Sequence, residues 1–202
     1  MPLWLARDPL VLASASKVRR ALLEAAGVPV NVHAARLDER SLEVGAATQA
    51  PGEVALMLAR AKTLAVTALH PGRLVLGADQ VLTLEERRFA KPPDIAAARE
   101  QLRALSGRTH ELHSAIAFAQ DSAMLFAHIG VARLTVRILS EHFIDLYLGA
   151  VGHAATASVG AYHIEALGVQ LFERIEGDYF TVLGLPLIAA LDFLRRRGDL
   201  AS

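Results

Sequence analysis

The stretch LVLASASKVRRALLEAAGV, residues 10–28, joins an apolar run directly to an amphipathic segment. LVLAS is typical of a buried strand, and KVRRALLEAAG spaces its apolar residues as a helix does before a glycine. Two serines and three cations lie at the junction, where free backbone N–H groups of a helix N-terminus attract anions. A serine cap before a solvated basic helix is the commoner cause of such a pattern. On this stretch alone the capping interpretation is preferred.

The rest of the chain alternates strand-like and helix-like segments. A buried strand is predicted over 73–79, ending on Asp79, and long paired strands over 109–121 and 123–139. A polar connection is expected over 38–49. This order predicts a mixed α/β fold, with a sheet, flanking helices and two lobes, in one domain covering 1–202. Helices are predicted over 17–27, 51–72, 93–107, 140–152 and 185–198.

The composition limits the kinds of partner and compartment. The 202 residues are 53% hydrophobic, and 21 basic residues balance 21 acidic ones, so nucleic acid and membrane are not predicted partners. The absence of cysteine excludes disulfides and thiol catalysis. Arg7 and Asp8 interrupt the apolar start, which argues against a signal peptide, and the uncharged stretch 146–164 is too polar for a membrane span. A cytoplasmic location is therefore predicted.

The common nucleotide and hydrolase fingerprints G-x-x-x-x-G-K-[ST], G-x-G-x-x-G and G-x-S-x-G do not occur. Asp79, at the predicted end of a strand, would by itself be interpreted as a turn cap. The chain also contains carboxylates and lysines that could join Asp79 in one site, and this favours a functional role for Asp79 over turn capping. Carboxylate oxygens hold Mg²⁺, and cations neutralise phosphate charge, so together these residues predict a metal-assisted phosphate site. The set comprises Glu39, Lys62, Asp79, Lys91 and Glu165.

A histidine pair and an arginine run are interpreted as structural features and not as ligand sites. His110 and His113 in HELH lie on a predicted strand, where residues three apart point to opposite faces, so they do not form a zinc pair. His110 is expected near the site. The run RRR at 195–197 is the solvated end of the last helix.

Five segments together resemble the Maf family of nucleoside triphosphate pyrophosphatases, from about residue 10 to residue 194. This resemblance implies an α/β enzyme of the Maf and ITPase-like kind, with a central cleft between two lobes, which often forms homodimers. It implies cleavage between the α- and β-phosphates of a nucleoside triphosphate, with a divalent cation, Mg²⁺ or Mn²⁺. The segments are LASASKVRRALLEAAG, LGADQVL, KPPD, LSGRTHELHSAIA and GAYHIEALGVQLFERIEGDYFTVLGLPLI.

The resemblance also assigns roles to individual residues. Asp79 matches the family's catalytic acidic residue, described as the proton acceptor. Glu39 and Asp79 match the carboxylates that hold the metal. Lys62 and Lys91 complete the catalytic set. The predicted substrate-binding residues are Ser14, Ser16, Val18, Arg19, Gln80 and Glu165.

The base pocket resembles the branch of the family that acts on 7-methyl-GTP. Asp79-Gln80 and Glu165 match that branch, and a glutamate suits the N1–H, amino group and positive charge of a methylated guanine. Val18 stands where that branch has an aromatic residue, so stacking on the cationic base, worth roughly 0.5–2 kcal/mol, is missing there. The alternatives are a nucleotide-binding regulator of cell division without hydrolysis, and a small-molecule phosphatase that releases inorganic phosphate.

Overall fold

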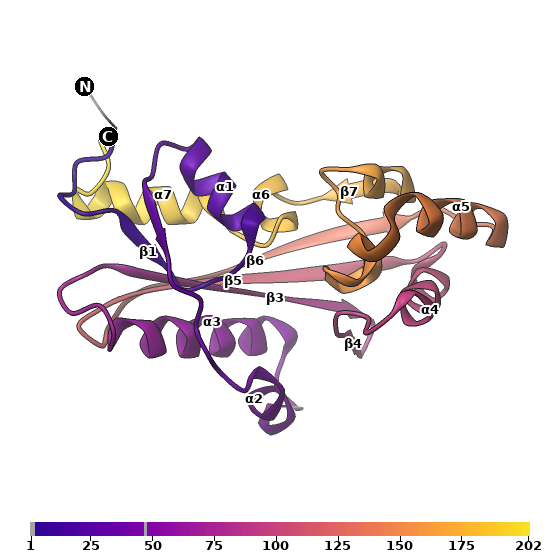
Figure 1. Cartoon of the computed structure of the whole chain (residues 1–202), viewed down its shortest axis with the longest axis horizontal. Coiled ribbons are helices and arrows are strands. Elements are labelled where there is room, and N and C mark those ends of the chain that lie inside the picture. The colour runs from indigo at the N-terminus through magenta and orange to yellow at the C-terminus, as the bar shows by residue number, and fades with distance from the viewer. Residues whose placement is uncertain (1–2, 47) are drawn as a thin grey trace. The chain divides into compact units, whose positions relative to one another are not determined.

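The computed structural model describes residues 3–46 and 48–202 and confirms a mixed α/β fold. A seven-stranded sheet has the order β2-β1-β3-β5-β6-β7, and β4 pairs with β3 outside this path (Figure 1). The strands are β1 (Leu10–Leu12), β2 (Val30–Val32), β3 (Val75–Leu84), β4 (Arg87–Phe89), β5 (Thr109–Gln120), β6 (Ala123–Val136) and β7 (Phe172–Glu176). The helices are α1 (Lys17–Ala25), α2 (Glu39–Gly45), α3 (Pro51–Thr67), α4 (Ile95–Leu105), α5 (Glu141–Val151), α6 (Tyr179–Val182) and α7 (Leu187–Arg197), with 3₁₀ turns η1 (Gly152–Thr156), η2 (Val159–Ala161) and η3 (Leu167–Leu171).

Most predicted elements are present, with two corrections. The hairpin between β5 and β6 turns at Asp121 and Ser122, whose φ angles of 49° and 66° suit a tight two-residue turn. The predicted strand does not end on Asp79, because β3 continues to Leu84 and places this aspartate inside the strand. The connection 38–49 is not wholly irregular, because Asp38 caps the short helix α2 by accepting a hydrogen bond from the Ser41 N–H.

The chain divides into two compact units, which are described separately. The first unit contains residues 1–80, 114–130 and 178–202, and the second contains 81–113 and 131–177. Strands β3, β5 and β6 each contribute residues to both units. This division agrees with the two predicted lobes, whereas the central cleft and the single domain over 1–202 stay predictions.

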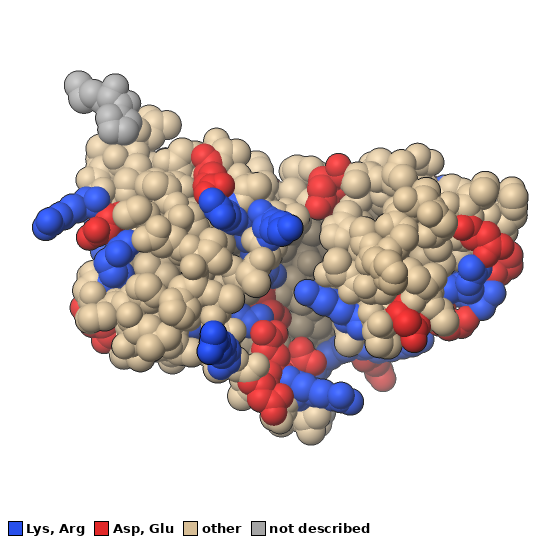
Figure 2. All heavy atoms as spheres, in the orientation of Figure 1, with Lys and Arg blue, Asp and Glu red and all other residues tan. Residues whose placement is uncertain are grey.

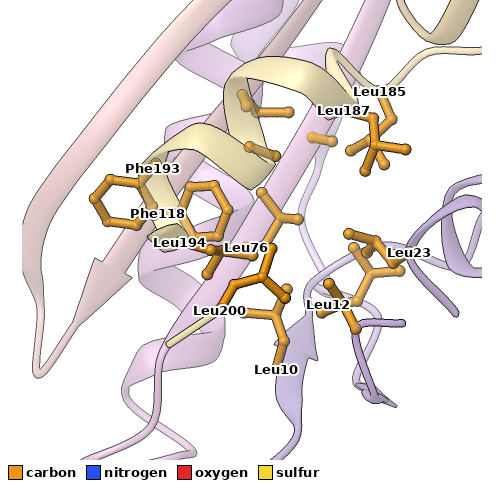
Figure 3. Packing of buried hydrophobic residues seen from close by; sticks show 14 residues of the cluster. Leu10, Leu12, Leu23, Leu76, Phe118, Leu185, Leu187, Phe193, Leu194 and Leu200 are labelled. Carbon is orange, nitrogen blue, oxygen red and sulfur yellow. The ribbon is translucent and has the colours of Figure 1, made fainter. Parts of the chain in front are cut away.

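The core of the first unit follows from the alternation of side chains along β1. Strand β1 pairs in parallel with β2 and β3, and all of its side chains are buried. Leu10 and Leu12 join a cluster with residues of α1 and α7, including Leu23 and Phe193 (Figure 3). Val11, between those two leucines, packs in a second cluster with Val66 of α3 and Val75. Helices α1 and α7 therefore cover one face of β1, and α3 covers the other (Figure 1).

The same alternation orients β3. Leu76 and Ala78 belong to the cluster that α7 covers, and Val75 belongs to the cluster on the α3 side. Gly77 also faces α3, and a Cβ at this position would lie 2.4 Å from the Ala59 carbonyl oxygen. The helix therefore packs on bare backbone at Gly77, and the next residue on the α3 face is Asp79.

The second unit holds its own buried aromatic cluster. His110 Nε2 lies 2.7 Å from the Tyr162 hydroxyl, and both rings contact Phe172. Burial lowers the pKa of His110 to about 4. Burial raises the pKa of Tyr162 as well. His110 is therefore a neutral core residue at neutral pH, bonded within its own unit.

The surface carries charges of both signs. Lys and Arg side chains are interleaved with Asp and Glu side chains on the face shown in Figure 2. Several form exposed ion pairs, such as Arg20 with Glu24 at 2.8 Å, and pairs of this kind contribute at most about 1 kcal/mol each. Across residues 3–46 and 48–202, no helix combines the length and the apolar character that crossing a bilayer would require.

Candidate functional site

Three of the predicted site residues meet in the first unit. The Lys62 ammonium on α3 donates a hydrogen bond to Oδ1 of Asp79 at 2.6 Å and lies 2.8 Å from Oε2 of Glu39. The Lys62 and Asp79 side chains are only 10% and 12% exposed, whereas Glu39, at the start of α2, is 43% exposed. One buried cation thus joins two carboxylates that come from different elements of the fold.

The position of this group follows from the packing of α3 on β3. Along α3, Ala59, Lys62, Thr63 and Val66 recur at helical spacing and are buried toward the sheet. Gly77 lets the Ala59–Thr63 turn approach the strand closely. Lys62 and Asp79 are therefore brought to hydrogen-bonding distance by apolar packing on either side of them.

Arg19 is fixed on the other face of β3. Its Nε donates to the Gly184 carbonyl at 2.8 Å, and its Nη1 donates to the Ala78 carbonyl at 2.6 Å and to the Ser14 hydroxyl at 3.1 Å. In the described part of the chain Nη2 makes no hydrogen bond, so its two N–H groups are free to bind a ligand. Burial lowers the pKa of the Arg19 guanidinium, and the negative charges of Asp79 and Glu39 oppose that shift. Arginine stays charged under such conditions, so Arg19 presents an oriented positive charge.

The junction between β1 and α1 is compatible with both helix capping and anion binding, the two interpretations of this stretch of sequence. Ser16 caps the helix by accepting a hydrogen bond from the Arg19 N–H at 3.3 Å, as the capping interpretation predicts. Ser14 is buried and accepts from the Ser16 N–H at 3.3 Å. Each hydroxyl keeps its own hydrogen for donation to an anion. Val18 is half-buried on α1, and Lys17 is exposed.

Gln80 points away from Asp79, as neighbours on a strand do. Its amide nitrogen donates to the Ser114 hydroxyl at 3.0 Å and to the Val182 carbonyl at 3.0 Å, and lies 3.3 Å from the Thr181 carbonyl. Ser114 donates in turn to that Thr181 carbonyl at 2.7 Å. The Gln80 amide nitrogen therefore holds α6, which leads directly to Gly184.

Two predicted site residues belong to the second unit. Lys91 is exposed in the segment between β4 and α4. Glu165 is exposed between η2 and η3, and its Oε1 lies 3.5 Å from Nδ1 of His163. Their assignment to the same site as Asp79 remains a prediction from the resemblance.

The carboxylate pair is suitable for a divalent cation. Within residues 3–46 and 48–202, no group of three or more His, Asp or Glu side chains is arranged to hold a metal ion. Glu39 and Asp79 nevertheless direct one oxygen each to a common point, the Lys62 ammonium, within 2.8 Å. Mg²⁺ is commonly bound by one or two carboxylates together with water and substrate phosphates. The donor set therefore fits Mg²⁺ or Mn²⁺ delivered with a phosphate ligand.

The supports of the site were not predicted from the sequence. Gly77 was visible only as a glycine within LVLGAD, with no indication that α3 would contact it. Gly184 has a φ angle of 85°, and its carbonyl binds Arg19 across 165 positions of sequence. A glycine before Leu-Pro signals a turn, but it does not identify what that turn holds.

The family-model match and the sequence relatives point to one family. The family model described as Maf-like protein matches residues 9–197. A protein of Rhodopseudomonas palustris named nucleoside triphosphate pyrophosphatase is 53% identical over 201 residues, covering all of both chains. One of Bradyrhizobium diazoefficiens with the same name is 50% identical over 96% of each chain.

A third relative carries a more specific name. A protein of Rhizobium etli named 7-methyl-GTP pyrophosphatase is 51% identical and covers 95% of this chain and 97% of its own. Among solved structures, a HAM1 protein from Coxiella burnetii is 18% identical, with a TM-score of 0.38 over 63% of this chain and 72% of that chain, a likeness too remote to bear on the fold. The match of the family model and the full-length relatives lead to one conclusion: this chain belongs to the Maf family.

Proposed function

We propose that this protein is a cytoplasmic nucleoside triphosphate pyrophosphatase that converts its substrate to a nucleoside monophosphate and pyrophosphate. The names of its full-length relatives support the enzyme class. The observation that carries the proposal is the buried Lys62 ammonium between Asp79 and Glu39, with the fixed guanidinium of Arg19 on the opposite face of β3. Carboxylates and oriented cations are what hydrolysis of a phosphoanhydride requires.

The residues of the first unit have distinct tasks in this reaction. Arg19 binds phosphate oxygens through Nη2, and the Ser14 and Ser16 hydroxyls donate beside it. Lys62 neutralises the negative charge that builds up on the phosphates as the anhydride bond breaks. Asp79 positions the attacking water, either by accepting its proton or by holding the metal ion that binds it. The family resemblance adds Lys91 to this set as a further cation.

We propose Glu39 and Asp79 as the residues that hold a divalent cation, Mg²⁺ or Mn²⁺. When bound, such an ion neutralises phosphate charge and orients the reacting oxygens. Its entry with the triphosphate is consistent with a donor set of only two carboxylates. Both carboxylates also keep a second oxygen, Oδ2 of Asp79 and Oε1 of Glu39, for further contacts.

We propose 7-methyl-GTP as the substrate, since a 51% identical relative bears that name and Glu165 provides a suitable carboxylate. Glu165 would accept from the N1–H and amino group of guanine and balance the charge of the methylated ring. Val18 adds an apolar contact without stacking. Gln80 uses its amide nitrogen on α6 and would contact the base only through Oε1. The homodimer implied by the resemblance remains a prediction.

A product assay tests this function. Purified protein is given 7-methyl-GTP, GTP, UTP, dTTP, CTP and ITP separately, with Mg²⁺ or Mn²⁺, and Asp79→Asn serves as the matched inactive variant. Pyrophosphate from 7-methyl-GTP, and at least about a hundredfold lower kcat in Asp79→Asn, are expected. Pyrophosphate mainly from a pyrimidine nucleotide would keep the enzyme class and refute the base assignment. Inorganic phosphate as the product would indicate the phosphatase, and binding without any product would indicate the regulator.

A further inference from the structure

The Lys62 ammonium makes the two contacts that a divalent cation would also need. We propose that Lys62 competes with the divalent cation for Glu39 and Asp79, so that the enzyme binds the metal tightly only together with nucleotide phosphates. This inference rests on the proposed function and adds an order of binding to it.

The contacts of Lys62 show why competition is expected. Its Nζ is 2.6 Å from Oδ1 of Asp79 and 2.8 Å from Oε2 of Glu39, so one cation already uses an oxygen of each carboxylate. A Mg²⁺ ion held by those oxygens at about 2.0–2.1 Å would lie too close to the ammonium for both to remain. Lys62 is 10% exposed and emerges from a packed helix, so its side chain has little freedom to withdraw into solvent.

The charges around Glu39 and Asp79 also disfavour metal binding in the absence of nucleotide. Two carboxylates face two cations, because Arg19 also interacts electrostatically with both Asp79 and Glu39. Because Lys62 and Arg19 already neutralise the two carboxylates, the group offers a divalent cation no net electrostatic attraction. A triphosphate adds negative charge that attracts both side chains and supplies further oxygens to the metal. The nucleotide phosphates therefore offset the positive charge of Lys62 and supply metal-coordinating oxygens at the same time.

The test measures binding of Mn²⁺ by electron paramagnetic resonance, with and without a non-hydrolysable α,β-methylene nucleotide. For the wild-type enzyme, the nucleotide should tighten Mn²⁺ binding by at least about tenfold. Lys62→Met should bind Mn²⁺ alone about tenfold more tightly than the wild-type enzyme, because the competing cation is gone. Lys62→Arg should stay as weak as the wild type.

Two controls locate the effect. Arg20→Met removes an exposed cation from α1 and should leave Mn²⁺ binding unchanged, and adding Glu39→Gln to Lys62→Met should abolish the gain. Equal Mn²⁺ affinity in Lys62→Met and wild type would overturn the proposal. Tight Mn²⁺ binding by the wild-type enzyme without nucleotide would overturn it even if Lys62→Met failed to fold. Neither result depends on turnover, so an enzyme that releases pyrophosphate would keep its proposed function while this proposal failed.

Discussion

The close contact at Gly77 predicts a specific defect when a single methyl group is added. In Gly77→Ala, the new Cβ would lie 2.2 Å from Oγ1 of Thr63 and 2.4 Å from the carbonyl oxygen of Ala59. Ordinary contact needs at least 3.4 Å, and the Ala59 carbonyl is backbone that cannot rotate away. Helix α3 must therefore move outward by about 1 Å, an overpacking strain that costs about 1–3 kcal/mol.

The same displacement of α3 should also lower the rate of catalysis. Lys62 lies on the turn of α3 that must move, and its ammonium is 2.6 Å from Asp79. A misplacement of about 1 Å in a catalytic group can lower turnover by about a hundredfold. Gly77→Ala should therefore unfold at a lower urea concentration than the wild type, melt about 2–12 °C lower, and show a strongly reduced kcat.

The assay combines urea unfolding with steady-state release of pyrophosphate. Gly149→Ala is the matched control, because Gly149 lies within α5 and a Cβ there would meet nothing within 4 Å. This control should gain about 0.5–1 kcal/mol of stability from the better helix propensity of alanine. The reasoning about α3 is refuted if Gly77→Ala unfolds at the wild-type urea concentration and turns over at the wild-type rate.

Two more predictions follow from buried contacts. Gly184→Ala should raise KM for the triphosphate, because a Cβ would lie 3.3 Å from Nη2 of Arg19 and the φ angle of 85° strains alanine; an unchanged KM would contradict this. Burial lowers the pKa of His110 from 6.5 to about 4. As the pH falls, the unfolded chain is therefore protonated at His110 at a higher pH than the folded chain. The free energy of unfolding should therefore fall by about 3 kcal/mol between pH 6.5 and pH 4, and this slope should be smaller in His110→Leu.

The elements with local signals were the ones that the sequence could predict. Helix α1 begins where Ser16 can cap it, and the hairpin turns where Asp121 and Ser122 follow an alternating strand. Helix α2 is not predicted because its seven residues include only two aliphatic side chains, Leu42 and Val44, which is too few for a helical period, and short helices depend on their surroundings. The strand β7 was missed for the same reason, since four of its five residues are exposed.

The error at Asp79 has a tertiary cause. An aspartate is rarely tolerated inside a buried strand, so ending the strand there was a sound local inference. Lys62, seventeen positions earlier, supplies the partner that lets β3 continue through Asp79 to Leu84. The residue chemistry places both side chains in one candidate site, but the local pattern does not show that Lys62 pairs directly with Asp79 inside the strand.

The alternation along β3 gives the candidate site two independent supports. Asp79 faces α3 and depends on Gly77 for its distance to Lys62, whereas Gln80 faces α6 and stabilises the segment that leads to Gly184 and Arg19. Disturbing the first support should act mainly on kcat, because it displaces the groups that face the reacting water. Disturbing the second should act mainly on KM, because Arg19 binds phosphate before and during the reaction. Gly77→Ala should therefore lower mainly kcat, and Gly184→Ala should raise mainly KM. If both variants changed the same kinetic parameter, the two faces of β3 would support the site as a single unit.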